Sequence, residues 1–88
     1  MIKKSVRVAL PNGLEARPVA ELVQVASKYD SNIYIEVDSK RVNAKSIMGM
    51  MTLELDSGEA IMVSADGEDE VSALQEVESF LKGDKVLD

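Results

Sequence analysis

The sequence predicts an α/β fold of two layers, in which helices cover one face of a four-stranded sheet. Four segments alternate apolar and polar residues with the period of two that is typical of half-buried strands. Two longer segments carry apolar residues at helical spacing, and a third, shorter helix is expected between strands. The polar strand positions suit an open face opposite the helices. They are Ser5, Arg7, Tyr34, Glu36 and Ser64, together with Met62.

The chain begins with an expected strand and an expected helix. Residues 2–10 form the strand, because apolar residues occupy the even positions from Val6 onwards. Pro-Asn-Gly at 11–13 ends it in a turn. A helix over residues 16–28 follows, with Pro18 near its first position. Its expected inward stripe consists of Ala16, Val19, Ala20, Val23 and Ala26.

Two strands and a short helix are expected next. Residues 33–37 alternate as a second strand, and a turn at 38–40 leads into a short third strand over 41–43. Ser46 stands where a short helix begins that runs towards Leu53. Serine is a preferred N-cap, because its oxygen accepts a hydrogen bond from a backbone N–H two or three residues later.

The last strand and helix complete the pattern. Residues 60–65 form the fourth strand, with alternate residues on one side. The acidic stretch 66–69 begins the final helix, where the helix dipole favours negative charge, and Gly83 ends it. The expected inward stripe is Val71, Leu74, Val77 and Leu81, flanked by Ala73 and Phe80.

Composition restricts the chemistry of the chain. The 88 residues, 45% hydrophobic and 30% charged, suit one small domain over residues 1–88. The absence of cysteine excludes disulfides and thiolate chemistry, and the absence of histidine removes the usual general base and metal ligand. We therefore expect neither metal nor cofactor. No apolar run reaches membrane-spanning length and no signal-peptide core follows Met1, so a soluble, cytoplasmic protein is expected.

Charge is unevenly distributed along the chain. The net charge is −6, with +2 in residues 1–44 and −8 in residues 45–88. This acidic balance argues against direct binding to nucleic acid, which needs a basic footprint. The basic residues of the first half either form a patch for an acidic protein partner or belong to a mixed, solvated surface. They are Arg7, Arg17, Lys40 and Arg41, followed by Lys45.

The segment around Ser46 has two interpretations from its residues alone. Ser46 is either a structural cap or a phosphorylation site at a helix end that tolerates negative charge. At about 100° per residue, Ile47, Met48 and Met51 share one face of the helix, and Met50 and Leu53 point elsewhere. Either all five pack in the core, or one face is left exposed as a partner surface.

Two motifs resemble those of HPr, the phosphocarrier family of the bacterial phosphotransferase system. Residues 13–18 read Gly-Leu-Glu-Ala-Arg-Pro, and the family's active-centre loop reads Gly, apolar, His, Ala, Arg, Pro. Residues 45–49 read Lys-Ser-Ile-Met-Gly and resemble the regulatory serine motif of HPr from Gram-positive bacteria. The resemblance covers essentially the whole chain. It implies an open-faced sandwich with antiparallel strand order 1-4-2-3.

The chain departs from the family pattern at Glu15, where the phosphoryl-accepting histidine is expected. A carboxylate could form only an acyl phosphate, which needs a dedicated site, usually with a metal. The resemblance therefore implies that phosphocarrier activity is absent, although Arg17 is retained. Glu15 either imitates the charge of phosphohistidine or is a surface residue without catalytic duty.

The retained serine motif is similar to that of HPr-like regulatory proteins of bacilli, which lack the active histidine. This implies a non-catalytic protein that HPr kinase/phosphorylase phosphorylates on Ser46 with ATP. The product would act as corepressor of catabolite control protein A in carbon catabolite repression, and the repressor alone would touch DNA. The partner would contact Ile47, Met48 and Met51, with Arg17 and Lys45 as a basic rim.

Other functions remain open from the sequence. The chain could be an HPr phosphocarrier that uses Glu15, or an HPr in which position 15 was engineered. A small enzyme on a similar sandwich and a plain ligand-binding module are further alternatives. The oligomeric state is a monomer or a homodimer, because the first strand is expected at a sheet edge and residues 11–13 could act as a hinge.

Overall fold

The computed structural model describes residues 1–10, 16–53 and 55–83. The strands are β1 (Ile2–Arg7), β2 (Asn32–Val37), β3 (Lys40–Asn43) and β4 (Ala60–Asp66). The helices are α1 (Ala16–Ser27), α2 (Ile47–Met51) and α3 (Glu70–Leu81). The element order is the expected one. No helix within these residues has the length and apolar character needed to cross a membrane.

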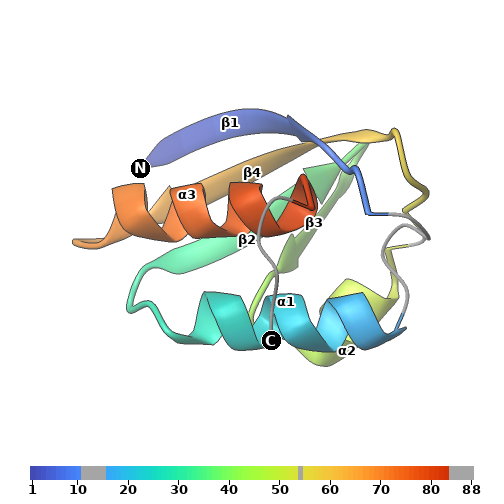
Figure 1. Cartoon of the computed structure of the whole chain (residues 1–88). Coiled ribbons are helices and arrows are strands. Elements are labelled where there is room, and N and C mark those ends of the chain that lie inside the picture. Colours follow the sequence, from blue (N-terminus) through green and yellow to red (C-terminus); the bar gives the residue numbers. More distant parts are fainter. Residues whose placement is uncertain (11–15, 54, 84–88) are drawn as a thin grey trace.

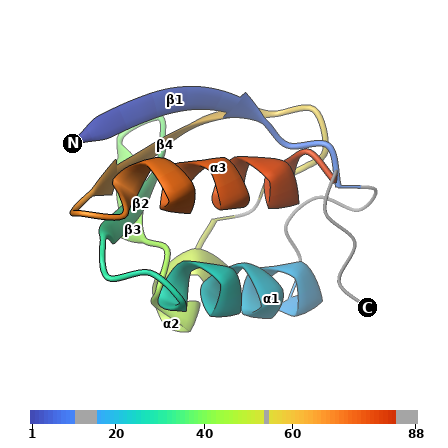
Figure 2. The same cartoon turned by 60° about the vertical axis from the view of Figure 1, so that its left-hand side comes forward.

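The four strands form one sheet in the order β1-β4-β2-β3, and every neighbouring pair is antiparallel. Figures 1 and 2 show α1 and α3 next to each other on the same side of this sheet. This is the open-faced sandwich with order 1-4-2-3 that the family resemblance implied, so the predicted fold class is confirmed.

The core lies between the sheet and the helices. Alternate residues of β2 and β4 point into it, because the side chains of a strand alternate between faces. The fully or almost fully buried side chains of these strands are Ile33, Ile35, Ile61, Val63 and Ala65. Those of α1 are Val19, Leu22, Val23, Val25 and Ala26, and those of α3 are Ala73, Leu74, Val77, Phe80 and Leu81.

The predicted stripe of α3 was wrong at Val71, whose side chain is 56% exposed. At 100° per residue, the five buried residues of α3 lie within about 60° of Val77, whereas Val71 lies about 120° away. The stripe of α1 was also misplaced. It left out the buried Leu22 and Val25 and included Ala20, which is only half-buried and about 160° from Leu22.

Several predicted strands and helices extend further along the chain than the observed ones. The first strand ends at Arg7 instead of residue 10, although Val8 still exchanges backbone hydrogen bonds with Gly58 and Glu59. Helix α2 ends at Met51, before the buried Leu53. Helix α3 starts at Glu70, because the chain first turns at 66–69.

The open face of the sheet is mostly polar, as predicted, but one of its polar residues is not exposed. Ser64 is fully buried, and its hydroxyl has no hydrogen-bond partner among the described residues. It sits on the central strand β4, between Lys3 of β1 and Tyr34 of β2. The Arg41 guanidinium lies 4.0 Å from the centroid of the Tyr34 ring, so this part of the face is covered by a cation–π pair.

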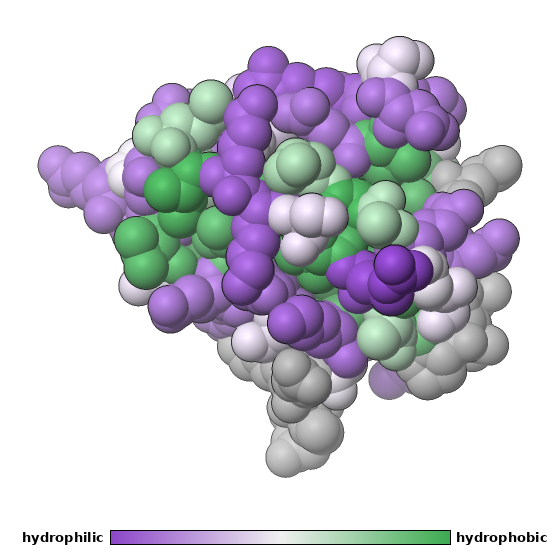
Figure 3. Space-filling view, turned by 90° about the horizontal axis from the view of Figure 1, so that it is seen from above, coloured by the Kyte–Doolittle hydropathy of each residue, from purple (hydrophilic) through white to green (hydrophobic). Residues whose placement is uncertain are grey.

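The edge strand β1 carries three exposed cationic side chains, Lys3, Lys4 and Arg7. Charged side chains on an edge strand discourage unwanted pairing with other chains. The Lys4 Nζ lies 2.8 Å from a carboxylate oxygen of Glu78, which ties β1 to α3. Seen from the side of β1, the surface mixes hydrophilic residues with small hydrophobic areas (Figure 3).

Candidate site at the Ser46 turn and helix α2

Ser46 is the N-cap of α2, as the sequence predicted. Its backbone is extended, with φ −104° and ψ 111°, and its Oγ accepts a hydrogen bond of 3.1 Å from the Gly49 N–H. Its carbonyl accepts the first helical hydrogen bond, 2.9 Å from the Met50 N–H. An N-cap residue lies at the first end of its helix, and here the Ser46 side chain is half-buried.

Backbone hydrogen bonds fasten the turn before Ser46 to the sheet. The Ala44 N–H donates to the Ile33 carbonyl at 2.8 Å, and Ala44 itself is fully buried. The Asn43 side chain accepts from the Lys45 N–H at 2.8 Å, and the Asn43 carbonyl accepts from the Ser46 N–H at 3.0 Å. The position of Ser46 is therefore set by β2 and β3 as well as by α2.

Gly49 lets α2 lie close to its own cap and to β3. A Cβ added there would stand 3.4 Å from the Ser46 Oγ and 3.6 Å from the Val42 Cβ. The first of these distances is at the limit of ordinary contact, so a larger side chain would crowd the serine hydroxyl.

Helix α2 divides its apolar residues between two faces. Met50 is fully buried and Leu53, just after the helix, is 4% exposed. Ile47, Met48 and Met51 are 51%, 83% and 50% exposed. The alternative in which all five pack in the core is therefore wrong. We call the three exposed residues the α2 apolar surface, and Ser46 directly precedes it.

Lys45, which was expected at the rim of this surface, makes a hydrogen bond within the chain. Its Nζ donates a 2.6 Å hydrogen bond to the backbone carbonyl of Tyr29, just past the end of α1, and the residue is half-buried. Arg17 differs, because its side chain is 91% exposed and its Nε lies 3.4 Å from the Glu21 carboxylate one turn later. Glu15 lies outside the described residues.

Tyr29 also connects α1 to α3. Its hydroxyl donates to the Glu76 carboxylate, which also accepts from the Lys28 Nζ at 2.6 Å. The hydrogen bond to Glu76, burial and the negative charge of Glu76 raise the pKa of Tyr29 to about 12. Sequence reasoning assigned no contact role to Tyr29 or Glu76, because they lie 47 positions apart and only the fold brings them together.

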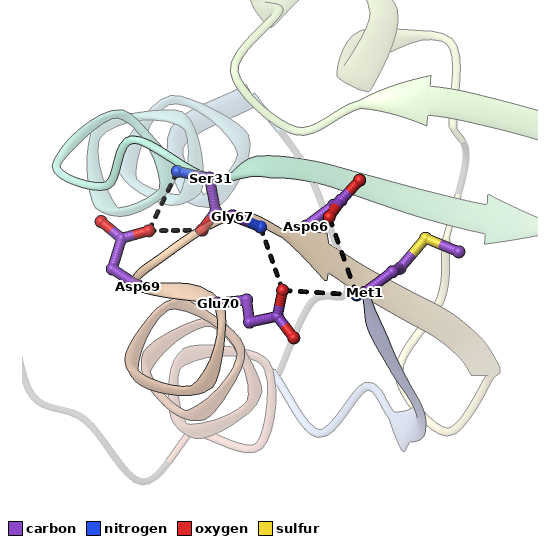
Figure 4. A network of polar contacts seen from close by, with 6 residues as sticks. All are labelled: Met1, Ser31, Asp66, Gly67, Asp69 and Glu70. Atoms are coloured by element: carbon purple, nitrogen blue, oxygen red, sulfur yellow. Dashed lines mark hydrogen bonds and ion pairs between the residues drawn. The ribbon is translucent and has the colours of Figure 1, made fainter.

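A second polar cluster joins the start of β2 to the start of α3 (Figure 4). The Asp69 carboxylate accepts hydrogen bonds from the Ser31 hydroxyl, the Asp30 N–H at 2.8 Å and the Ser31 N–H at 3.0 Å. These bonds, above all that from the Ser31 hydroxyl, lower the pKa of Asp69. Glu70 accepts from the Gly67 N–H at 3.0 Å. The sequence had assigned these acids to the helix dipole alone.

A shallow cavity of about 300 Å³ lies between the β2–β3 turn and the chain that follows α2. Its lining combines apolar residues with charged ones: Val37, Asp38, Ser39, Lys40, Thr52, Leu53, Leu55 and Glu59. Within the described ranges, no group of three or more acidic side chains is placed to hold a metal ion.

Known sequences resemble this chain over nearly its whole length. The family model described as the PTS HPr component phosphorylation site matches residues 2–83. The HPr-like protein Crh of Halalkalibacterium halodurans is 46% identical over 93% of this chain and 98% of its own length. Crh of Bacillus subtilis is 43% identical over 93% of this chain and 96% of its own length. The phosphocarrier HPr of Treponema pallidum is 46% identical over 93% of this chain and 93% of its own length.

Solved structures agree with these sequence matches. HPr of Bacillus anthracis superposes with a TM-score of 0.88 at 44% identity, covering 91% of this chain and 95% of its own. Crh of Bacillus subtilis, described as a domain-swapped dimer, superposes with a TM-score of 0.79 at 40% identity, covering 99% and 100%. Because the family model matches residues 2–83 and relatives at 43–46% identity match 93% of the chain, the chain belongs to the HPr family of the bacterial phosphotransferase system.

Proposed function

We propose that this chain is a regulatory HPr-like protein that HPr kinase/phosphorylase phosphorylates on Ser46. The phosphorylated form then acts as corepressor of catabolite control protein A in carbon catabolite repression. One observation carries the proposal: three large apolar side chains, each at least half exposed, directly follow a serine at the surface. The 43–46% identity to relatives named Crh supports it.

The proposed modification transfers the γ-phosphoryl group of ATP to the Ser46 Oγ. The new P–O bond forms as the bond to the β-phosphate oxygen breaks, the serine proton leaves to a base of the kinase, and ADP is released. Phosphorylation adds about −1.5 to −2 charges and three strong acceptor oxygens. A repressor could meet these oxygens with Arg or Lys side chains, which form short, charge-assisted hydrogen bonds with phosphate.

The α2 apolar surface supplies the remainder of the proposed contact. Exposed apolar clusters mark protein interfaces, and methionine suits them because its side chain is flexible and polarizable. Exposed Arg17 remains available as a cationic contact. The protein would thus bind the repressor and leave DNA to it. We expect it to act in the cytoplasm as a monomer or a homodimer.

Phosphocarrier activity is proposed to be absent. A neutral imidazole can take a phosphoryl group and pass it on, whereas the Glu15 carboxylate would form an acyl phosphate, usually in a site that holds a metal. Histidine is absent from the whole sequence, so no other residue offers the family's usual chemistry. The alternative function is a phosphocarrier that uses Glu15 or was engineered at that position. It predicts that the protein gains a phosphate from Enzyme I and phosphoenolpyruvate.

Phosphorylation is tested by intact mass after two incubations. The first contains HPr kinase/phosphorylase with ATP, and the second contains Enzyme I with phosphoenolpyruvate. We expect one phosphate from the kinase only, and none in the Ser46→Ala variant. A phosphate gained from Enzyme I would support the carrier alternative. A chain labelled by neither would leave Ser46 as a helix cap without a regulatory role.

The docking surface is tested by Met48→Asp in the phosphorylated protein. Met48 is 83% exposed, so its replacement should not disturb the core, but a carboxylate there should weaken binding to the repressor at least tenfold. Val71→Asp is the matched control, because Val71 is 56% exposed on a different helix. Surface plasmon resonance would measure both. Full binding by Met48→Asp, or an equal loss in both variants, would contradict the proposed surface.

A further inference from the structure

We propose that Lys45 is a positioning residue, which holds the Ser46 turn against the end of α1 through the backbone carbonyl of Tyr29. This inference deepens the proposed function, on which it rests, because it names the residue that presents Ser46 to the kinase. The expected contact of Lys45 with the partner stays a prediction.

The contact places a cation beside the C-terminal end of α1, because Tyr29 lies two residues after Ser27, where the helix ends. A cation is favoured near the negative end of the helix dipole. Helix α1 has no basic residue in its own last turn. The Lys45 Nζ, 16 positions later, stands 2.6 Å from the Tyr29 carbonyl oxygen. A hydrogen bond with a charged donor is stronger than one between neutral groups.

The acceptor is itself held in place. The Tyr29 hydroxyl is bonded to Glu76 of α3, and the Tyr29 N–H donates to the Ala26 carbonyl at 3.2 Å. Lys45 therefore reaches a carbonyl that is fixed to two helices, which makes it a firm anchor for a short turn.

Because Lys45 directly precedes Ser46, its hydrogen bond to the Tyr29 carbonyl also restricts the position of Ser46. The backbone N–H of Lys45 is bonded to the Asn43 side chain, so both ends of the lysine are engaged. Without the anchor, the turn should populate other conformations. A kinase that needs one conformation then binds with an apparent affinity reduced by the competent fraction. The effect should appear in KM and leave kcat nearly unchanged.

Three variants separate this role from its alternatives. Lys45→Met keeps the apolar stem and removes the donor. Lys45→Arg keeps a cationic donor. Lys4→Met removes the lysine that joins β1 to α3 through Glu78 at 2.8 Å, away from the Ser46 turn, so it is a matched control for the loss of one lysine contact between elements. Two measurements apply to each: amide hydrogen exchange at Ser46 and Gly49 in the unmodified protein, and steady-state kinetics of phosphorylation by HPr kinase/phosphorylase with ATP.

For Lys45→Met we expect about tenfold faster exchange at Ser46 and Gly49, relative to amides of β4, and a similar rise in KM. Lys45→Arg should restore both values, and Lys4→Met should leave both close to those of the unaltered protein.

Unchanged exchange in Lys45→Met with a raised KM would overturn the inference, because Lys45 would then contact the kinase itself. Equal acceleration at Ser46 and in β4 would also overturn it, since the lysine would stabilise the whole fold. If the kinase does not modify the unaltered chain, the proposed function fails, and the exchange comparison still decides whether Lys45 fixes the turn.

Discussion

At Gly67 two segments of the chain come closer than a side chain would allow. A Cβ added there would lie 2.6 Å from the Ser31 Oγ and 2.7 Å from the Ser31 Cα, and the residue has φ +156°. Ser31 cannot move away easily, because it is 1% exposed and its N–H and its hydroxyl both donate hydrogen bonds to the Asp69 carboxylate. The junction between β2 and α3 therefore depends on glycine.

Gly67→Ala should lower the free energy of unfolding by about 2–4 kcal/mol, from steric overlap with Ser31 and an unfavourable backbone conformation. Gly58→Ala is the matched control. Its φ of +96° is also unfavourable for alanine, but nothing lies within 4 Å of the added Cβ. We expect a loss of about 1–2 kcal/mol there. Urea unfolding would measure both, and equal losses would show that contact with Ser31 is unimportant.

Among the elements, α2 shows how one short helix serves both the core and the surface. The five-residue helix turns Met50 inward and Met51 outward, one position apart. Its length leaves no room for a second buried face, and the exposure of three residues decides between the two interpretations that the sequence left open. The sequence did not decide which role its exposed residues play, because periodicity reports burial and not partners.

The two methionines make a direct comparison. Met50→Ala should lower the free energy of unfolding by about 2–4 kcal/mol, because it leaves a cavity at a fully buried position. Met51→Ala should change it by less than about 0.5 kcal/mol, because Met51 is half exposed. Thermal and urea unfolding of the pair would check this. A comparable loss in both variants would mean that Met51 belongs to the core.

For the whole molecule, carboxylates with lowered pKa values connect separate elements. The Asp69 carboxylate accepts hydrogen bonds from Ser31. The Glu78 carboxylate accepts hydrogen bonds from Lys4 of β1 and from Lys82. Glu70 accepts from the Gly67 N–H. In each case, the hydrogen bonds favour the ionised form and lower the pKa below the ordinary values of 3.8 for Asp and 4.5 for Glu.

The sign of the resulting pH dependence follows from these shifts. A pKa that is lower in the folded state stabilises the fold above the unfolded pKa, and this contribution is lost as the pH falls through the folded pKa. Stability should therefore decline as the pH falls below about 4.5. Asp69→Asn and Ser31→Ala should each reduce the acid dependence of the unfolding free energy, measured in urea from pH 7 to pH 2. An unaltered slope in both variants would contradict this origin.

The sequence predicted the layers, the element order and the cap at Ser46, because periodicity and capping are local signals. It misplaced the stripes of α1 and α3 by a fraction of a turn, as with Val71, because several apolar positions fit more than one face. It gave no sign that Lys45 binds the Tyr29 carbonyl, just past the end of α1. That contact depends on how the layers meet, which no local pattern records.

The Ser64 hydroxyl lies in the middle of the sheet and has no hydrogen-bond partner within the described part of the chain, so its removal should make the fold more stable. A buried polar group without a partner costs free energy, and its removal should raise the free energy of unfolding. Ser64→Ala should therefore raise the melting temperature, by the equivalent of about 1 kcal/mol, as calorimetry would measure. A lower melting temperature would show that the hydroxyl is satisfied. Natural proteins stay near the stability they need, so the stability gained by Ser64→Ala would let that variant accept destabilising changes at its surface.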